Sequence, residues 1–122
     1  MRSRPHVAVV DDDESVRESL PDLLRELGYE AKPFASAEAF LASGCIGDTR
    51  CLILDVAMPG MSGPELHQAL LLEGRTIPVI FITALTAKSI PALLQKGAVA
   101  CLTKPFSAQD LRGALATALP GT

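Results

Sequence analysis

Acidic residues gather at two places in the sequence where a short run of apolar residues stops. Asp11, Asp12 and Asp13 follow one such run, and Asp55 follows another. Carboxylates held close together in a partly buried site repel one another, so a cluster of them favours a hard divalent cation with oxygen ligands. If both runs are strands that end at the same edge of a sheet, the carboxylates predict a Mg²⁺ site.

Two further polar residues stand in comparable places later in the chain. Thr83 directly follows an apolar run, and Lys104 comes soon after another. A carboxylate beside Mg²⁺ can act as a nucleophile toward a phosphoryl group, and this transfer depends mainly on positioning and on neutralising the phosphoryl oxygens. The Lys104 ammonium and the Thr83 hydroxyl are donors suited to that purpose.

The first acidic cluster also has a structural explanation. Acidic residues just before and inside the first turn of a helix interact favourably with the helix dipole, by about 0.3–1 kcal/mol each. One such residue is enough for this effect, so capping alone does not account for three consecutive aspartates.

Short apolar runs alternate with longer segments of helical periodicity along the chain. The runs predict strands at 6–10, 29–34, 51–54, 78–82 and 99–102. The periodic segments predict helices at 14–27, 37–41, 63–72 and 108–119, the second and fourth capped by Ser36 and Ser107, and a further helix within 86–96. Pro91 restricts that helix, because proline fits only a first turn or a break. This alternation predicts an α/β fold, a doubly wound parallel sheet of five strands that binds ligands beyond the carboxyl ends of its strands.

Length and composition exclude several classes of protein. The 122 residues suit one domain, spanning 1–122, and the hydrophobic content of 48% against 20% charged residues excludes disorder. A membrane span needs about 18 consecutive apolar residues, and no segment has them. The net charge of -3 argues against direct binding of nucleic acid.

The three cysteines form no CxxC pair and lie at no metal-ligand spacing. We therefore interpret Cys45, Cys51 and Cys101 as small apolar side chains rather than as disulfide or metal-binding residues. The N-terminal residues lack the apolar region of a secretory signal, and a cytoplasmic location is expected.

Four segments together resemble the receiver domain of bacterial two-component response regulators. They are Val10-Asp-Asp-Asp-Glu14, Asp55-Val-Ala-Met-Pro-Gly-Met-Ser-Gly63, Ile82-Thr-Ala84 and Lys104-Pro-Phe106, and they occur in the family's order across the whole chain. Phe34-Ala-Ser-Ala-Glu38 and Pro78-Val-Ile-Phe-Ile-Thr83 resemble most the receivers of FixJ, LuxR-type transcriptional regulators. The resemblance implies a CheY- and flavodoxin-like three-layer sandwich with strand order 2-1-3-4-5.

The resemblance also implies a set of Mg²⁺ ligands. Asp12 and Asp55 would bind the ion together with the backbone carbonyl of Ala57, and Asp11 would complete the acidic pocket partly through water. Asp13 lies outside the family motif, as does the adjacent Glu14, and we assign both residues the capping role.

For the reaction itself, the resemblance implies that Asp55 accepts the phosphoryl group from a sensor histidine kinase. Lys104 would pair with Asp55 and then with the phosphoryl oxygens, and Thr83 would donate a hydrogen bond to the phosphoryl group. A cis peptide at Lys104-Pro105 would aim the lysine, and residues 58–63 would shape the loop beside the acceptor. Such a protein is not an enzyme in the ordinary sense, because it catalyses only its own phosphorylation and dephosphorylation.

Three positions depart from the family pattern. Cys101 stands three residues before the lysine, where an aromatic side chain is common. Pro91 lies in the segment that usually forms the signalling helix. Ala57 and Leu85 lack the polar groups that orient the hydrolytic water in some relatives. From Cys101 we expect a weakened conformational switch, and from Pro91 a truncated or shifted signalling helix. From Ala57 and Leu85 we expect a slow intrinsic loss of the phosphoryl group.

The resemblance further implies control of an output, in this case transcription, and pairing of active chains. The homodimer would use the helix within 86–96, the strand at 99–102 and the helix at 108–119. The ending Pro120-Gly-Thr122 fits either a single-domain regulator or, as we favour, a receiver excised from a longer transcription factor.

Other functions were weighed against this one. A haloacid-dehalogenase-type phosphatase needs a second acid two residues after its nucleophile, where this chain has Ala57. A flavodoxin-like carrier needs a phosphate-binding loop rich in Ser, Thr and Gly, which is missing from the sequence. A degenerate receiver that serves as a phosphorylation-independent interaction module remains the alternative, motivated by Cys101 and Pro91.

Overall fold

The structure is a computed structural model that describes residues 4–84 and 97–120. Its strands are β1 (His6–Val10), β2 (Glu30–Phe34), β3 (Cys51–Asp55), β4 (Val79–Thr83) and β5 (Ala100–Thr103). Its helices are α1 (Glu14–Glu26), α2 (Ala37–Ala42), α3 (Gly63–Leu72) and α5 (Ala108–Ala118), with a short 3-10 turn η1 (Ile46–Asp48). The expected helix within 86–96 lies outside the described residues, together with Leu85 and Pro91.

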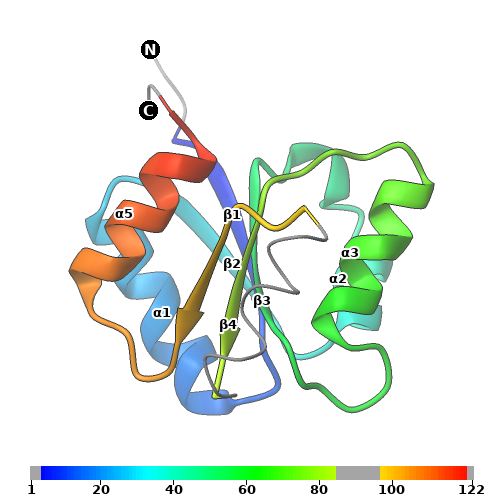
Figure 1. Cartoon of the computed structure of the whole chain (residues 1–122), viewed down its shortest axis with the longest axis horizontal. Helices are drawn as coiled ribbons and strands as arrows, with labels where there is room; N and C mark the ends of the chain where they lie inside the picture. Colours follow the sequence, from blue (N-terminus) through cyan, green and yellow to red (C-terminus); the bar gives the residue numbers. More distant parts are fainter. Residues whose placement is uncertain (1–3, 85–96, 121–122) are drawn as a thin grey trace.

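The five strands form one parallel sheet in the order β2-β1-β3-β4-β5, which confirms the expected fold. Helices α1 and α5 cover one face of the sheet, and α2 and α3 cover the other (Figure 1). All strands run in the same direction, so their carboxyl ends share one edge. The start of β1 and the end of α5 lie at the opposite edge (Figure 1).

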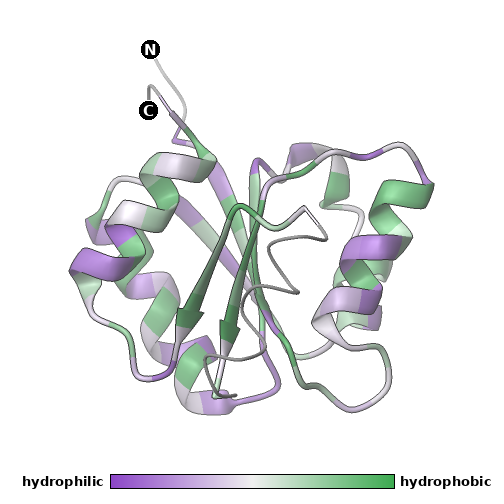
Figure 2. Cartoon of the chain, in the orientation of Figure 1, coloured by the Kyte–Doolittle hydropathy of each residue, from purple (hydrophilic) through white to green (hydrophobic). Residues whose placement is uncertain are grey.

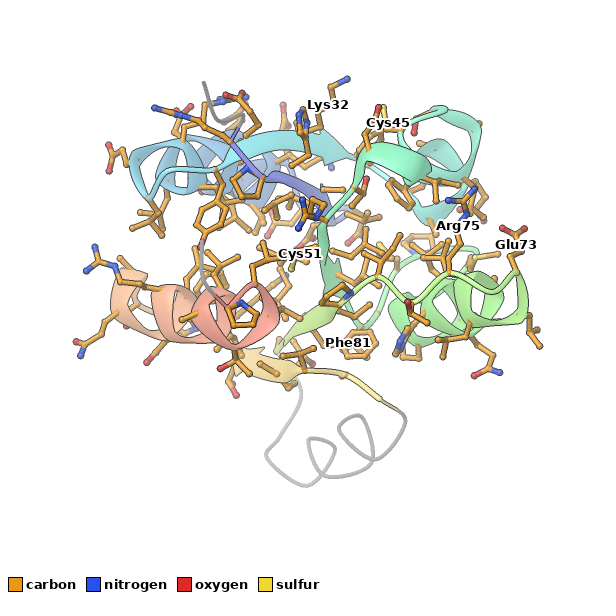
Figure 3. The ribbon with its side chains drawn as sticks, turned by 90° about the horizontal axis from the view of Figure 1, so that it is seen from above. Lys32, Cys45, Cys51, Glu73, Arg75 and Phe81 are labelled. Atoms are coloured by element: carbon orange, nitrogen blue, oxygen red, sulfur yellow. The ribbon has the colours of Figure 1, made fainter. Side chains whose placement is uncertain are left out.

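Side-chain alternation along the central strands builds two cores. In β3, Cys51 and Ile53 join the cluster with α1 and α5, whereas Leu52 and Leu54 join the cluster with α2 and α3. Because both faces are covered, the strand reads as an unbroken apolar run. Figure 2 shows β4 and β5 as apolar strands, whereas the helices carry both apolar and hydrophilic residues. Viewed from above, Cys51 and Phe81 point from the sheet toward opposite layers (Figure 3).

Polar caps set where the helices begin. Asp13 caps α1, and the serines at the starts of the later helices cap theirs: Ser36 for α2, Ser62 for α3 and Ser107 for α5. The last two also form capping boxes, with Glu65 and Asp110 returning a hydrogen bond to the cap backbone. These caps fix the lengths of the loops that follow each strand end.

Several predicted boundaries were wrong by one residue. The strands expected to stop at residues 54 and 82 continue through Asp55 and Thr83, because the parallel ladder pairs Asp55 with Ile82 and Thr83 with Thr103. The strand expected from 29 begins at Glu30, and η1 was not predicted. The cis peptide at Lys104-Pro105 is present as expected. In the described part of the chain, no helix is long and apolar enough to cross a membrane.

Candidate functional site

The carboxylates from two neighbouring strands meet at the carboxyl edge of the sheet. Val10 pairs with Leu54, so Asp11 and Asp55, the residues that follow, face each other across the β1 and β3 ends. Oxygen atoms of Asp11, Asp12 and Asp55 all lie within 4.8 Å of one another. Asp11 is fully buried and Asp55 is 7% exposed, whereas Asp12 faces solvent. The sequence clusters at 11–13 and 55 therefore form one acidic pocket.

The backbone and charged neighbours hold Asp11 in a fixed orientation. Its Oδ1 accepts a hydrogen bond from the backbone N–H of Asp13 at 2.9 Å, and its backbone oxygen accepts one from Arg17 Nη1 at 3.0 Å. Its Oδ2 is buried and, among the described residues, accepts no hydrogen bond of good geometry. This oxygen has a charge contact instead, with Lys104.

Lys104 enters the pocket from the segment after β5. Its Nζ lies 3.0 Å from Asp11 Oδ2 and 3.8 Å from Asp55 Oδ1. Its backbone N–H donates to the Thr83 carbonyl at 2.8 Å, which continues the β4 and β5 pairing up to the lysine. Burial alone would lower the pKa of Lys104, but the carboxylates of Asp11 and Asp55 outweigh burial and raise it. The lysine is therefore cationic.

Asp55 is the carboxylate most disturbed by this setting. Its burial and the negative charge of Asp11 raise the pKa of Asp55 to about 7, against the opposing effect of Lys104. A cation that enters the pocket would stabilise the ionised form of this carboxyl group and so lower its pKa.

Thr83 lies at the same sheet edge as the acids. It is the last residue of β4, is 1% exposed, and sits between the ends of β3 and β5. The fold therefore places a hydroxyl, an ammonium and three carboxylates around the ends of four adjacent strands.

The donor set fits Mg²⁺. The pocket offers carboxylate oxygens from Asp11, Asp12 and Asp55. In the part of the chain that the structure describes, the buried Oδ2 of Asp11 has a charge contact with Lys104 but no hydrogen bond of good geometry. Hard oxygen ligands with several negative charges are what this ion prefers. Ala57 lies two residues beyond Asp55 in the exposed part of the loop between β3 and α3.

Asp13 has the capping role expected for it. Its side chain accepts from the Ser15 backbone N–H at 2.9 Å and from the Ser15 hydroxyl at 3.0 Å. Hydrogen bonds from Ser15 lower the pKa of Asp13. Glu14 occupies the first turn of α1.

Two contacts near the pocket were missed by reasoning from the sequence. One is the bond from Arg17 to the Asp11 carbonyl, and the other joins the Met61 backbone N–H to Glu38 Oε2 at 3.1 Å. Glu38 was noticed only as part of the segment that resembles FixJ. Neither hydrogen bond can be recognised from a sequence motif, because each depends on which side of a helix faces a loop.

Cys101 lies where β5 faces the core formed with α2 and α3. It is partly buried, packs against that core, and pairs in register with Phe81 of β4. Its small side chain therefore occupies the position expected to hold an aromatic residue.

Comparison with known proteins gives consistent matches. Residues 7–116 match the family described as response regulator receiver domain. Response regulator protein TmoT of Ectopseudomonas mendocina is 43% identical over 118 residues, covering 93% of this chain and 52% of TmoT. Transcriptional regulatory protein TdiR of Thauera aromatica is 40% identical over 114 residues, covering 93% of this chain and 50% of TdiR.

Solved structures agree with these relatives. The structure titled FixJ-N is similar with a TM-score of 0.85 and 36% identity, over 100% of this chain and 98% of that one. The chain spans about half the length of the curated relatives that it matches.

Proposed function

Because the chain belongs to the family of response regulator receiver domains, we propose that it accepts a phosphoryl group from a sensor histidine kinase on Asp55. One observation carries the proposal: the carboxylate of Asp55 lies among Asp11, Asp12 and Lys104 at the carboxyl edge of the sheet. A nucleophile, a cation and a divalent-metal donor set in one pocket are the parts that phosphoryl transfer requires.

In the proposed reaction, a carboxylate oxygen of Asp55 attacks the phosphorus atom and an acyl phosphate bond forms. The bond between phosphorus and the donor atom breaks, and its electron pair leaves with the donor. Lys104, 3.8 Å from Asp55 in the unmodified protein, then pairs with the phosphoryl oxygens. The Thr83 hydroxyl donates a hydrogen bond to the same group. The ammonium and the hydroxyl both stabilise the negative charge on these oxygens.

The proposed Mg²⁺ ligands are Asp11, Asp12, Asp55 and the backbone carbonyl of Ala57. When bound there, the ion would supply positive charge that keeps Asp55 ionised and screens the phosphoryl oxygens from the surrounding carboxylates. Since burial and Asp11 raise the pKa of Asp55 to about 7, this charge matters at neutral pH.

The proposed signal leaves through a conformational change that controls an output. Relatives that match this chain over half their length include a transcriptional regulatory protein, so transcription is the proposed output. We propose that residues 1–122 form one receiver domain in the cytoplasm. In the phosphorylated state it pairs with a second copy of the chain, and it makes no direct contact with nucleic acid.

Acetyl phosphate with and without Mg²⁺, followed by intact-mass measurement, tests the proposal. The wild-type protein should gain one phosphoryl group only with Mg²⁺, and Asp55→Asn should gain none. Asp48→Asn removes an exposed aspartate far from the pocket and should behave as wild type. A phosphoryl group on the Asp55→Asn protein would overturn the assignment.

Cys101 favours one other candidate, an interaction module that works without phosphorylation. Cys101 pairs in register with Phe81 and offers only a small thiol where an aromatic residue is common in the family, so we expect a weaker link between the pocket and the surface. The same experiment separates the two functions, because such a module gains no phosphoryl group.

A further inference from the structure

We propose that Glu38 is a positioning residue that holds the loop between β3 and α3 in the shape needed to bind Mg²⁺. This loop, residues 56–62, carries Ala57 and starts directly after Asp55. The inference rests on the proposed function, because it assigns to Glu38 a role in presenting the Ala57 carbonyl to the acidic pocket.

Helix α2, which carries Glu38, is anchored firmly to the sheet. Ser36 caps the helix, and Ala37 and Phe40 are fully buried under it. Phe40 also packs edge to face against Phe34 of β2, with ring centroids 5.3 Å apart. The backbone of Glu38 is therefore fixed relative to the sheet, although its side chain lies at the surface.

From this base the side chain reaches the loop. Glu38 Oε2 accepts a hydrogen bond from the Met61 backbone N–H at 3.1 Å, across 23 residues of sequence. An ionised acceptor makes such a bond stronger than one between neutral groups. The bond therefore connects the loop to α2, whereas the loop itself leads into α3.

Gly60 is shaped to this contact. Its φ of +76° suits glycine, and a Cβ at this position would lie 2.7 Å from Glu38 Oε2. A side chain there would displace the carboxylate from its present place beside the Met61 N–H. The glycine thus lets the loop and the carboxylate approach each other.

The two ends of the loop are fastened independently. Val56 N–H donates to the Ile82 carbonyl at 3.1 Å, and Gly63 N–H donates to the Val56 carbonyl at 3.2 Å. Met58 is buried in the core formed with α2 and α3. These contacts hold the residues on both sides of Ala57, and the bond from Glu38 constrains the rest of the loop around Gly60, so the whole loop that carries Ala57 keeps one shape.

A simpler role for Glu38 must be separated from this one. It lies in the first turn of α2, where a negative charge favours the helix dipole. Glu38→Gln removes the charge but keeps an oxygen that can accept from Met61, whereas Glu38→Ala removes both. Glu18→Ala removes one exposed negative charge from α1 and serves as the control for a general charge effect.

Two measurements test the proposal, neither of which depends on phosphorylation. Amide hydrogen exchange by NMR should show faster exchange at Met61 in Glu38→Ala and near-wild-type exchange in Glu38→Gln. Calorimetric titration with Mg²⁺ should show affinity about threefold to tenfold weaker in Glu38→Ala, the effect of losing about one hydrogen bond. Glu38→Gln should recover most of this loss, and Glu18→Ala should match wild type.

Mg²⁺ affinity unchanged in Glu38→Ala, or equally weak in Glu38→Gln and Glu38→Ala, would overturn the positioning role. Failure of the proposed function has a different signature, because the wild-type protein itself would then bind no Mg²⁺. Loss of folding in Glu38→Ala would appear in the exchange of amides throughout the sheet. Glu38→Asp, which keeps the charge but is too short to reach Met61, would then take its place and should weaken Mg²⁺ binding in the same way.

Discussion

The Nζ atom of Lys104 lies closer to the buried Asp11, at 3.0 Å, than to Asp55, at 3.8 Å. The lysine therefore compensates the charge of the acid that does no covalent chemistry, and it leaves the proposed acceptor less tightly paired. In the proposed reaction, the ammonium would move only a short way from Asp11 to reach phosphoryl oxygens on Asp55.

Replacing Lys104 should have opposite effects on folding and on metal binding. Lys104→Met leaves the buried Asp11 without its cation, so we expect the free energy of unfolding in EDTA to fall by about 1–3 kcal/mol. The same variant should bind Mg²⁺ more tightly, because the lysine and the metal ion compete for the same carboxylates. Urea unfolding and calorimetric titration measure the two effects.

Lys32→Met, which removes an exposed lysine from β2, provides the control and should change neither quantity appreciably. Weaker Mg²⁺ binding in Lys104→Met would show that the lysine holds the carboxylates in place for the metal rather than competing with it.

Asp55 should make the metal-free protein less stable as pH rises. Its pKa is about 7 in the folded protein and 3.8 without the fold, so the folded state binds more protons between these values. Stability from Asp55 is thus fully present below about pH 4 and lost as pH rises through about 7, at about 1.4 kcal/mol for each pH unit at most. Thermal melts in EDTA should show that Asp55→Asn exceeds wild type above pH 7 but not near pH 4.

Asp12→Ala should raise stability by less, because Asp12 is exposed to solvent. His67 has the opposite effect on the pH dependence of stability. Burial lowers the pKa of His67 in the folded protein, so its protonation in the unfolded state destabilises the folded protein as pH falls. His67 is common to all three proteins, so the difference between variant and wild type isolates the carboxylates. A difference that stays constant from pH 4 to pH 8 would mean that Asp55 keeps an ordinary pKa.

The parts of the site that could be predicted from the sequence are those that follow from the geometry of the sheet alone. Asp11 and Asp55 could be placed from the sequence because parallel strands end at one edge of the sheet, whatever the loops do. The preference of Lys104 for Asp11 could not, because it depends on distances that differ by less than 1 Å. The Glu38 contact was also out of reach, since it joins a helix and a loop through no repeating pattern.

Gly63 should tolerate no side chain, unlike the other glycine that lies within a helix. A Cβ on Gly63 would overlap the backbone oxygen of Asp55, whereas a Cβ on Gly113 in α5 would meet nothing within 4 Å. Gly63→Ala should therefore lower both the melting temperature and the phosphorylation rate, because Asp55 must shift. Gly113→Ala should stabilise the protein by about 0.5–1 kcal/mol, since alanine favours the helix. Equal stability of the two variants would contradict the close approach at Gly63.

Cys101 should limit how fully the signal is transmitted from the pocket. An aromatic residue at position 101 that filled the space left when Thr83 moves toward the phosphoryl group would contribute about 1–2 kcal/mol by burying apolar surface, and the small thiol cannot. A phosphoryl group shifts a two-state equilibrium only by the difference that it makes between the states. We therefore expect coupling to be weaker but present.

Sedimentation velocity with the phosphate mimic beryllofluoride measures this coupling through the proposed pairing of two chains. Wild type should show a modest rise in dimer, and Cys101→Phe and Cys101→Tyr should show a larger one. Cys45→Phe adds the same ring at a partly exposed position after α2, outside β5, and so controls for general stickiness. Full dimerisation of wild type with no gain in the aromatic variants would mean that the conformational switch does not pass through position 101.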